Sequence, residues 1–220
     1  MNGPMDIEQA RFNMVRQQIR PWEVLDNDVL KVVEQTPREL FVPEQYRKLA
    51  FSDLEVPLPN GQSMMAPKLE ARMLQALQIK PDDRILEIGT GSGFVTACLA
   101  KMGSHVDTLE WFKDLSSQAQ RNVEQLGIDN VSFSRENALQ QRVTGHYDII
   151  AVTASMPVYH DVFEKTLAKG GRMFVVTGKA PVMQAQLFTK VDVQGLCCST
   201  LLETCLPPLI GFDEPQTFQL

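Results

Sequence analysis

Residues 84–94 of this 220-residue chain, RILEIGTGSGF, decide its fold. The apolar run Arg84–Ile88 leads into three glycines at alternate positions, Gly89, Gly91 and Gly93, and an apolar pattern with helical spacing follows them. Glycine tolerates positive φ and lets a ligand approach the backbone, and the first turn of the next helix presents free N–H groups. The stretch predicts a strand, a ligand-binding turn and a helix.

Short apolar runs and helical patterns alternate on the C-terminal side of this stretch. The expected strands are Arg84–Ile88, His105–Leu109, Val131–Ser134, Tyr147–Thr153 and Arg172–Thr177, and the expected helices are Phe94–Met102, Phe112–Leu126 and Val158–Ala168. Such alternation requires crossover connections, which place helices on both faces of a mostly parallel sheet. Gln184–Val191 and Leu196–Thr204 are expected to add an antiparallel pair. The prediction is an α/β fold with a doubly wound, mostly parallel, seven-stranded Rossmann-like sheet.

The N-terminal part of the chain is expected to form a helical cap. Apolar residues recur at helical spacing across Asp6–Ile19, and a second helix is expected to begin after a capping residue, Asp26 or Asn27. Prolines then interrupt the pattern, so Pro57–Pro67 is expected to be a loop that leads into a helix.

The composition is that of an acidic globular protein. Lys and Arg number 21 against 27 Asp and Glu, which gives a net charge of −6, and 44% of the residues are hydrophobic. This charge disfavours nucleic acid and anionic membranes as partners. Because no secretory pattern or long apolar segment is found, we expect a cytoplasmic protein. We expect one domain over 1–220, with the cap and its loop in 1–80 and the α/β core in 81–220.

The cysteines and histidines indicate neither disulfides nor a metal site. The four cysteines form no C-x-x-C pair, and we expect them to be reduced residues in or near the core. The three histidines lack the spacing of metal ligands, so no metal is expected. These residues are Cys98, Cys197, Cys198, Cys205, His105, His146 and His160.

Glu110 follows the expected second strand and adds a second feature of a nucleoside site. A carboxylate at a strand end next to the glycine turn can accept hydrogen bonds from both hydroxyls of a ribose. The turn differs from a dinucleotide-binding turn, because Phe94 stands where G-x-G-x-x-G needs its third glycine. Trp111 is a candidate for packing against the base. The alternative is that the glycines form only a tight turn and that Glu110 is a solvated strand end.

Four stretches resemble known methyltransferases. The pattern E-x-G-x-G-x-G over Glu87–Gly93 resembles motif I of the S-adenosylmethionine-dependent methyltransferases. Three others resemble the protein-L-isoaspartate (D-aspartate) O-methyltransferase family: TPRELFVP at Thr36–Pro43, GQSMMAP at Gly61–Pro67, and Tyr147–Pro157 with the Gly170-Gly171 pair after it. The resemblance spans about Arg11 to Leu209. It implies a Rossmann-like methyltransferase that passes the methyl group of S-adenosylmethionine to the carboxylate of an isoaspartyl or D-aspartyl residue, leaving S-adenosylhomocysteine.

The resemblance also implies which residues contact the cofactor. The family's G-D-G motif aligns with Arg135-Glu136-Asn137, so Glu136 is the expected acceptor for the adenine amino group. The full set of expected cofactor contacts is Glu87, Gly89, Thr90, Gly91, Ser92, Gly93, Glu110, Trp111, Glu136 and Asn137.

The expected catalytic residues depart from the family pattern. The family's active-site serine aligns with Met65, whose thioether donates no hydrogen bond to a carboxylate. Ser63 and Lys68 are the candidates to supply that contact, Lys68 as a cation that pairs with the acceptor carboxylate. The alternative is that Ser63 caps the following helix and that Lys68 is solvated.

Three functions therefore stay open from the sequence. The first is an isoaspartyl carboxyl methyltransferase whose partner is a protein or peptide that carries isoaspartate. The second is a methyltransferase with another acceptor, and the third is a cofactor-binding protein without isoaspartyl activity. The sequence leaves the oligomeric state open.

Overall fold

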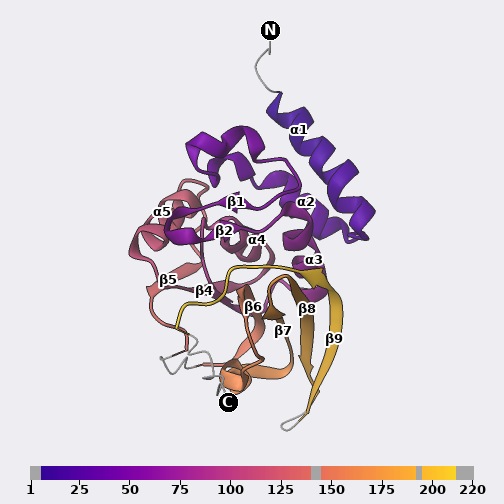
Figure 1. The fold of residues 1–220 in the computed structure, drawn as a ribbon, viewed down its shortest axis with the longest axis vertical. Helices are drawn as coiled ribbons and strands as arrows, with labels where there is room; N and C mark the ends of the chain where they lie inside the picture. The colour runs from indigo at the N-terminus through magenta and orange to yellow at the C-terminus, as the bar shows by residue number, and fades with distance from the viewer. Residues whose placement is uncertain (1–5, 140–144, 192–194, 212–220) are drawn as a thin grey trace, which may run out of the picture.

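A seven-stranded sheet forms the centre of the computed structural model, which describes residues 6–139, 145–191 and 195–211 (Figure 1). The strand order is β5-β4-β3-β6-β7-β8-β9. The strands from β3 to β7 pair in parallel, and β8 and β9 pair antiparallel. Their bounds are Arg84–Ile88 (β3), His105–Glu110 (β4), Val131–Arg135 (β5), Tyr147–Met156 (β6), Leu167–Lys179 (β7), Val182–Lys190 (β8) and Leu196–Thr204 (β9). The predicted fold class is confirmed.

The direction of winding reverses at β3. β4 and β5 lie on one side of β3, and β6 and β7 lie on the other. In the register, Ile88 at the end of β3 pairs with both Leu109 of β4 and Val152 of β6. Ligands of open α/β sheets bind in the crevice at the carboxyl ends of the strands at such a reversal. The glycine turn after Ile88 therefore opens onto the expected ligand position.

One large hydrophobic cluster joins the cap to the sheet. It contains residues of the cap, of α2 to α5 and of the sheet, and Ile19, Leu74 and Ile149 are fully buried in it. The α-helices are Ile7–Asn13 (α1), Asn27–Gln35 (α2), Pro67–Leu77 (α3), Phe94–Met102 (α4) and Lys113–Glu124 (α5), and a π-helix, Met14–Ile19, continues α1. Asp6 caps α1, and of the two predicted candidates for the cap of α2, Asp26 and Asn27, the structure selects Asp26. None of the described helices is long and apolar enough to span a membrane.

The predicted loop Pro57–Pro67 contains a small hairpin. β1 (Val56–Pro57) pairs antiparallel with β2 (Ser63–Met64), and a 3-10 turn, Pro59–Gly61, joins them. The Asn60 side chain donates to Asp114 at the start of α5, with Nδ2–Oδ1 and Nδ2–Oδ2 distances of 3.0 and 3.1 Å. The hairpin thereby leads into α3 while its turn stays against α5.

The predicted helix Val158–Ala168 is wrong. The structure has only a 3-10 turn, Asp161–Phe163, and β7 already begins at Leu167. The Lys190 ammonium of β8 donates to the carbonyl oxygens of Glu164 and Leu167 at 2.8 and 2.7 Å. This contact with a distant strand takes carbonyls that a continuing helix would use, and no local pattern reveals it.

A second hydrophobic cluster covers the opposite face of the sheet. It contains Leu86, Ile150, Met173 and Phe163, all fully buried, and none of its described residues comes from α1 to α5. The prediction of helices on both faces is therefore wrong for the described part of this face, where the 3-10 turn that contains Phe163 and the irregular segments beside it pack in place of a helix.

The expectation for the cysteines is correct only for Cys98, which is buried in α4. Cys197 and Cys198 are exposed because β9 is the outermost strand of the sheet and little packs against it, and Cys205, directly after β9, is exposed as well. All four cysteines are free thiols. No group of three or more potential metal-ligating side chains occurs within the described residues.

Candidate cofactor site

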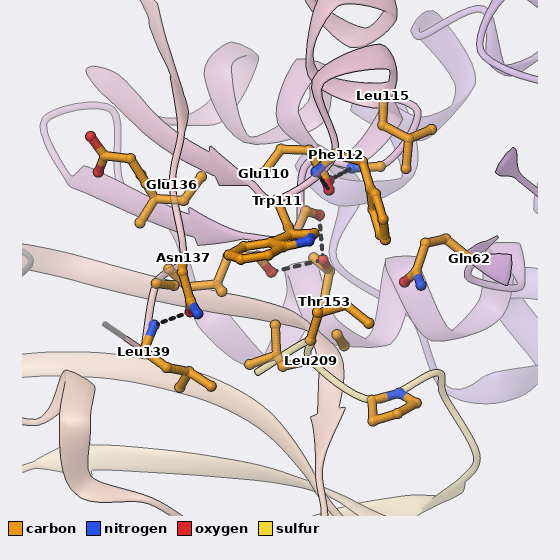
Figure 2. Close-up of a pocket in the computed structure, with 18 of the residues that line it drawn as sticks. Gln62, Glu110, Trp111, Phe112, Leu115, Glu136, Asn137, Leu139, Thr153 and Leu209 are labelled. Carbon is orange, nitrogen blue, oxygen red and sulfur yellow. Dashed lines mark hydrogen bonds between the residues drawn. The ribbon is translucent and has the colours of Figure 1, made fainter. Parts of the chain in front are cut away.

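A cavity lies at the carboxyl ends of β3, β4 and β6, where the winding reverses (Figure 2). We call it the outer cavity. Of the predicted cofactor contacts it brings together Gly89, Gly91, Glu110, Trp111, Glu136 and Asn137, and it adds side chains from the hairpin, from α5 and from the segment after β9. Its lining includes Gln62, Ser63, Gly89, Gly91, Glu110, Trp111, Phe112, Leu115, Glu136, Asn137, Leu139, Thr153 and Leu209.

Glu110 connects the tip of β4 to the glycine turn. Its Oε2 atom accepts the Gly91 N–H at 2.9 Å, and its Oε1 atom accepts the Phe112 N–H at 3.0 Å. The side chain is only 6% exposed. Each carboxylate oxygen has a further lone pair, so Glu110 can hold the turn and still accept hydrogen bonds from a ligand.

The three glycines have positive φ values of 96°, 54° and 87° at Gly89, Gly91 and Gly93. A Cβ at Gly89 would lie 2.6 Å from the Thr153 hydroxyl, and one at Gly93 would lie 3.1 Å from the backbone of Ala119 in α5. The turn therefore needs glycine both for its backbone angles and for the close approach of β6 and α5.

Glu87 lies behind the turn and lines neither this cavity nor the one described below. It is fully buried, and its Oε2 atom accepts hydrogen bonds from the Thr96 and Thr108 hydroxyls at 2.5 and 2.7 Å. Burial raises its pKa to about 8, against the lowering effect of the two hydroxyls. The structure thus places Glu87 where it supports the turn from inside the sheet. The Thr90 hydroxyl, 2.6 Å from that of Thr108, belongs to the same network.

Glu136 and Asn137 lie on one side of the outer cavity, next to Trp111 (Figure 2). The Trp111 ring lies across the cavity, and its side chain is 44% exposed. The Glu136 carboxylate points away from Trp111, whereas Asn137 lies below the ring and accepts the Leu139 N–H at 2.9 Å. The buried Asn137 Nδ2 has no partner in the described part of the chain. A donor for a base is therefore present at Asn137.

A second cavity, the inner cavity, lies between the glycine turn, the hairpin and α3. Ser63, Gly89, Gly91 and Thr153 line both cavities, so the two are adjacent. The inner cavity adds Met65, Thr90 and Ser92 from the predicted set, together with Leu58, Met64, Glu70, Phe94 and Val95. Gly93 lines neither cavity.

Lys68 lies outside both cavities. Its ammonium group is 2.8 Å from Asp53 Oδ2 and lies over the Trp22 ring, 4.3 Å from the centroid. Residues two apart in an α-helix point about 200° apart around its axis, so Lys68 and Glu70 face opposite sides of α3. Glu70, which the sequence prediction omitted, is the residue that lines the inner cavity.

Ser63 stays at the site, where both cavities meet. Its hydroxyl donates to Glu55 Oε2 at 2.9 Å, and the residue before α3, Ala66, provides no side-chain cap. The alternative of a capping role for Ser63 is therefore wrong. Met65 is buried in the inner cavity, and its carbonyl oxygen accepts from Arg38 Nη2 at 2.8 Å.

The sequence prediction missed several lining residues. Thr153 ends a predicted strand and Phe112 begins a predicted helix, so both could have been found at the ends of predicted elements. Leu209 carried no signal, because its position depends on contacts between β6 and the segment after β9. Its N–H donates to the Ser155 carbonyl at 2.8 Å, and the Ser155 N–H donates to the Pro207 carbonyl at 2.9 Å. These bonds hold the segment after β9, the yellow trace in Figure 1, against β6, where it lines the cavity.

The sheet order, the glycine turn and the strand-end glutamate define the class of Rossmann-like methyltransferases. Residues 9–211 match the family model of protein-L-isoaspartate(D-aspartate) O-methyltransferase. Protein-L-isoaspartate O-methyltransferase 1 of Rhodopseudomonas palustris is 36% identical over 93% of this chain and 84% of its own length. The Koribacter versatilis protein-L-isoaspartate O-methyltransferase is 35% identical over 91% and 90%. The chain belongs to the protein-L-isoaspartate(D-aspartate) O-methyltransferase family.

A solved structure shows the same fold. It is a putative protein-L-isoaspartate O-methyltransferase from Plasmodium falciparum in complex with S-adenosyl-L-homocysteine, with a TM-score of 0.77 and 24% identity. The match covers 93% of this chain and 98% of that one. It includes the cap as well as the sheet, since the sheet alone is much shorter than the matched length.

Proposed function

We propose that the protein transfers the methyl group of S-adenosylmethionine to the carboxylate of an isoaspartyl or D-aspartyl residue in a protein or peptide. The observation that carries the proposal is the position of Glu110, held by the Gly91 and Phe112 N–H groups at the edge of the outer cavity. A carboxylate in this position can accept hydrogen bonds from both of the adjacent hydroxyls of a ribose.

The residues of the outer cavity fit the adenosine part of this cofactor. Glu110 faces the ribose hydroxyls, and Trp111 offers an aromatic face to the adenine. The unpartnered Asn137 Nδ2 is a donor for a ring nitrogen of the base, and Glu136 remains a candidate for its amino group only if its side chain turns inward. S-adenosylmethionine supplies an electrophilic methyl group on a sulfonium.

The acceptor needs orientation more than activation. A carboxyl group of this type has a pKa near 4, so it is already anionic at neutral pH and needs no general base. Its oxygen must meet the methyl carbon in line with the departing sulfur, at about 3 Å, in a site that excludes water. Met64 and Met65 supply apolar walls to the inner cavity. We assign the Ser63 hydroxyl, which lines both cavities, as the hydrogen-bond donor to the acceptor carboxylate, which then takes the place of Glu55 Oε2 as the acceptor of its single proton.

Met65 is the reason to consider another function. A methyltransferase with a different acceptor, or a cofactor-binding protein without isoaspartyl activity, is compatible with the loss of the family serine. Membership of the family favours the isoaspartyl acceptor. We further propose that residues 1–220 act as one domain, in the cytoplasm, without nucleic acid or membrane partners, in keeping with the net charge of −6.

A labelled-methyl assay tests the proposal. Incubation of the protein with methyl-labelled S-adenosylmethionine and an isoaspartyl peptide should place the label in a base-labile ester. The same peptide with an ordinary aspartyl residue is the matched control and should stay unlabelled. Label that appears only on other acceptors contradicts the isoaspartyl assignment. Cofactor binding by calorimetry without transfer to any acceptor supports the third hypothesis.

A further inference from the structure

Glu70 is a buried charged residue that the proposed function has not used. It lies in α3, is 2% exposed, and is the one charged side chain among the described residues that line the inner cavity. Its neighbours in that lining are the turn residues Gly89 to Ser92 and apolar side chains of the hairpin. A charge in such a place is costly unless it has partners.

Arg38 is a hydrogen-bonding partner of Glu70, and it occupies only one side of the Glu70 carboxylate. The fully buried Arg38 donates from Nη1 to Glu70 Oε2 and from Nη2 to the Met65 carbonyl, and its guanidinium lies over the Phe94 ring, 4.7 Å from the centroid. Glu70 Oε1 has no hydrogen-bond partner within the described residues. Burial raises the pKa of Glu70, and Arg38 acts against that rise. One acceptor oxygen therefore remains for a cation in the cavity.

The amino-acid part of S-adenosylmethionine carries a positively charged α-ammonium group and a negatively charged carboxylate. If the ribose binds at Glu110, this end extends from the outer cavity into the adjacent inner cavity, since both include Gly89 and Gly91. α4 begins there with Gly93 as its N-cap, which has no side chain to cap the helix. The Phe94 N–H is 3.4 Å from Ser92 Oγ, and the N–H groups that follow it in the first turn can donate to the cofactor carboxylate.

We propose that Glu70 binds the α-ammonium group of S-adenosylmethionine through Oε1, and that Arg38 keeps the carboxylate oriented from the other side. The inference rests on the proposed function, because it takes the cofactor from it. It assigns this chain a cofactor-binding residue in α3, outside the glycine turn and outside the neighbouring strand ends.

A ligand pair tests this without any substitution. Calorimetry would compare S-adenosylhomocysteine with its analogue that lacks the α-amino group, and 5′-methylthioadenosine would report on the adenosine part alone. A charge-assisted hydrogen bond predicts about 10- to 100-fold tighter binding of the ligand that carries the amino group. Equal binding of the two ligands by the wild-type protein would overturn the role of Glu70 and leave the proposed function intact. Binding of none of the three ligands would contradict the proposed function itself.

The Glu70→Gln variant then locates the effect. It should bind S-adenosylhomocysteine about 10- to 100-fold more weakly and the deaminated analogue as the wild type does, so that the preference disappears. Glu39→Gln is the matched control, because Glu39 is another buried glutamate with an arginine partner, Arg11 at 2.7 Å, and lines neither cavity. It should keep the preference. An equal loss for both ligands in Glu70→Gln would show a purely structural role and overturn the proposal.

Discussion

The ends of β3 and β4 lie side by side, and each strand carries a glutamate that the sequence assigned to the cofactor. Glu87 pairs in register with Thr108 of β4, and Glu110 lies two residues beyond Thr108. Glu110 accepts hydrogen bonds from backbone N–H groups at the edge of the outer cavity, whereas Glu87 accepts hydrogen bonds from hydroxyl groups inside the core. Burial disfavours the charged form of Glu87 and raises its pKa to about 8. Glutamate is thus placed to accept hydrogen bonds from a ligand at the end of β4, and it supports the glycine turn from inside the core at the end of β3.

The largest effect is expected from the turn that both glutamates serve. Gly91→Val places a β-branched side chain at a φ of 54° and disturbs the N–H that Glu110 accepts. Strain and loss of that contact together predict a decrease in S-adenosylmethionine affinity of about 100-fold or more. Calorimetric titration measures it, and unchanged affinity would place the cofactor elsewhere.

Gly127→Val provides the control for backbone strain in the Gly91 experiment. Gly127 has a similar φ of 69° and follows α5, and a Cβ at this position would meet no atom within 4 Å. This variant should lose stability and keep its affinity for S-adenosylmethionine.

A smaller effect is expected at the tip of β4. Glu110→Gln removes the negative charge and places an amide N–H2 group, itself a donor, opposite a backbone N–H donor. S-adenosylmethionine should therefore bind about 10- to 100-fold more weakly. Glu136→Gln is the companion variant, because the Glu136 carboxylate points away from Trp111. Its affinity should change by less than about threefold. A larger loss in Glu136→Gln than in Glu110→Gln would reverse the two roles.

The smallest effect on cofactor binding is expected inside β3, where Glu87 contributes to stability. Since the native state raises the pKa of Glu87 from 4.5 to about 8, it retains a proton that the unfolded chain releases. The stability contributed by this group is complete below pH 4.5 and is lost as the pH rises to about 8, at up to about 1.4 kcal/mol per pH unit.

Glu87→Gln mimics the protonated side chain and should remove this pH dependence. Between about pH 6 and 7.5, denaturant unfolding should show the wild type losing about 2 kcal/mol relative to the variant. Parallel curves for the two proteins would mean that Glu87 is ionised in the native state.

Most of the fold could be predicted because its signals are local. The strand Arg84–Ile88 and the helix Phe94–Met102 have the predicted bounds, and Asp26 caps α2 as its side chain and position suggest. The helix Val158–Ala168 could not be excluded, because the Lys190 ammonium that binds its carbonyl groups comes from another strand.

The candidate site also has a part that local sequence predicts and a part that depends on packing. The glycine turn, Glu110 and Trp111 are consecutive with predicted strand ends, so their positions follow from the parallel order of the sheet. Lys68 and Glu70 differ by two positions on one helix, and only the packing of α3 against the hairpin and the turn decides which of them faces the cavity.

The sequence by itself determined the alternation of strands and helices, the glycine turn and the acidic strand end, because periodicity and backbone freedom act over neighbouring residues. Tertiary structure alone decided that Glu87 is buried, that Glu70 rather than Lys68 enters the inner cavity, and that Leu209 covers the outer one. These outcomes depend on which distant segments exclude water from a side chain or supply its partners, and such contacts leave no trace in local spacing.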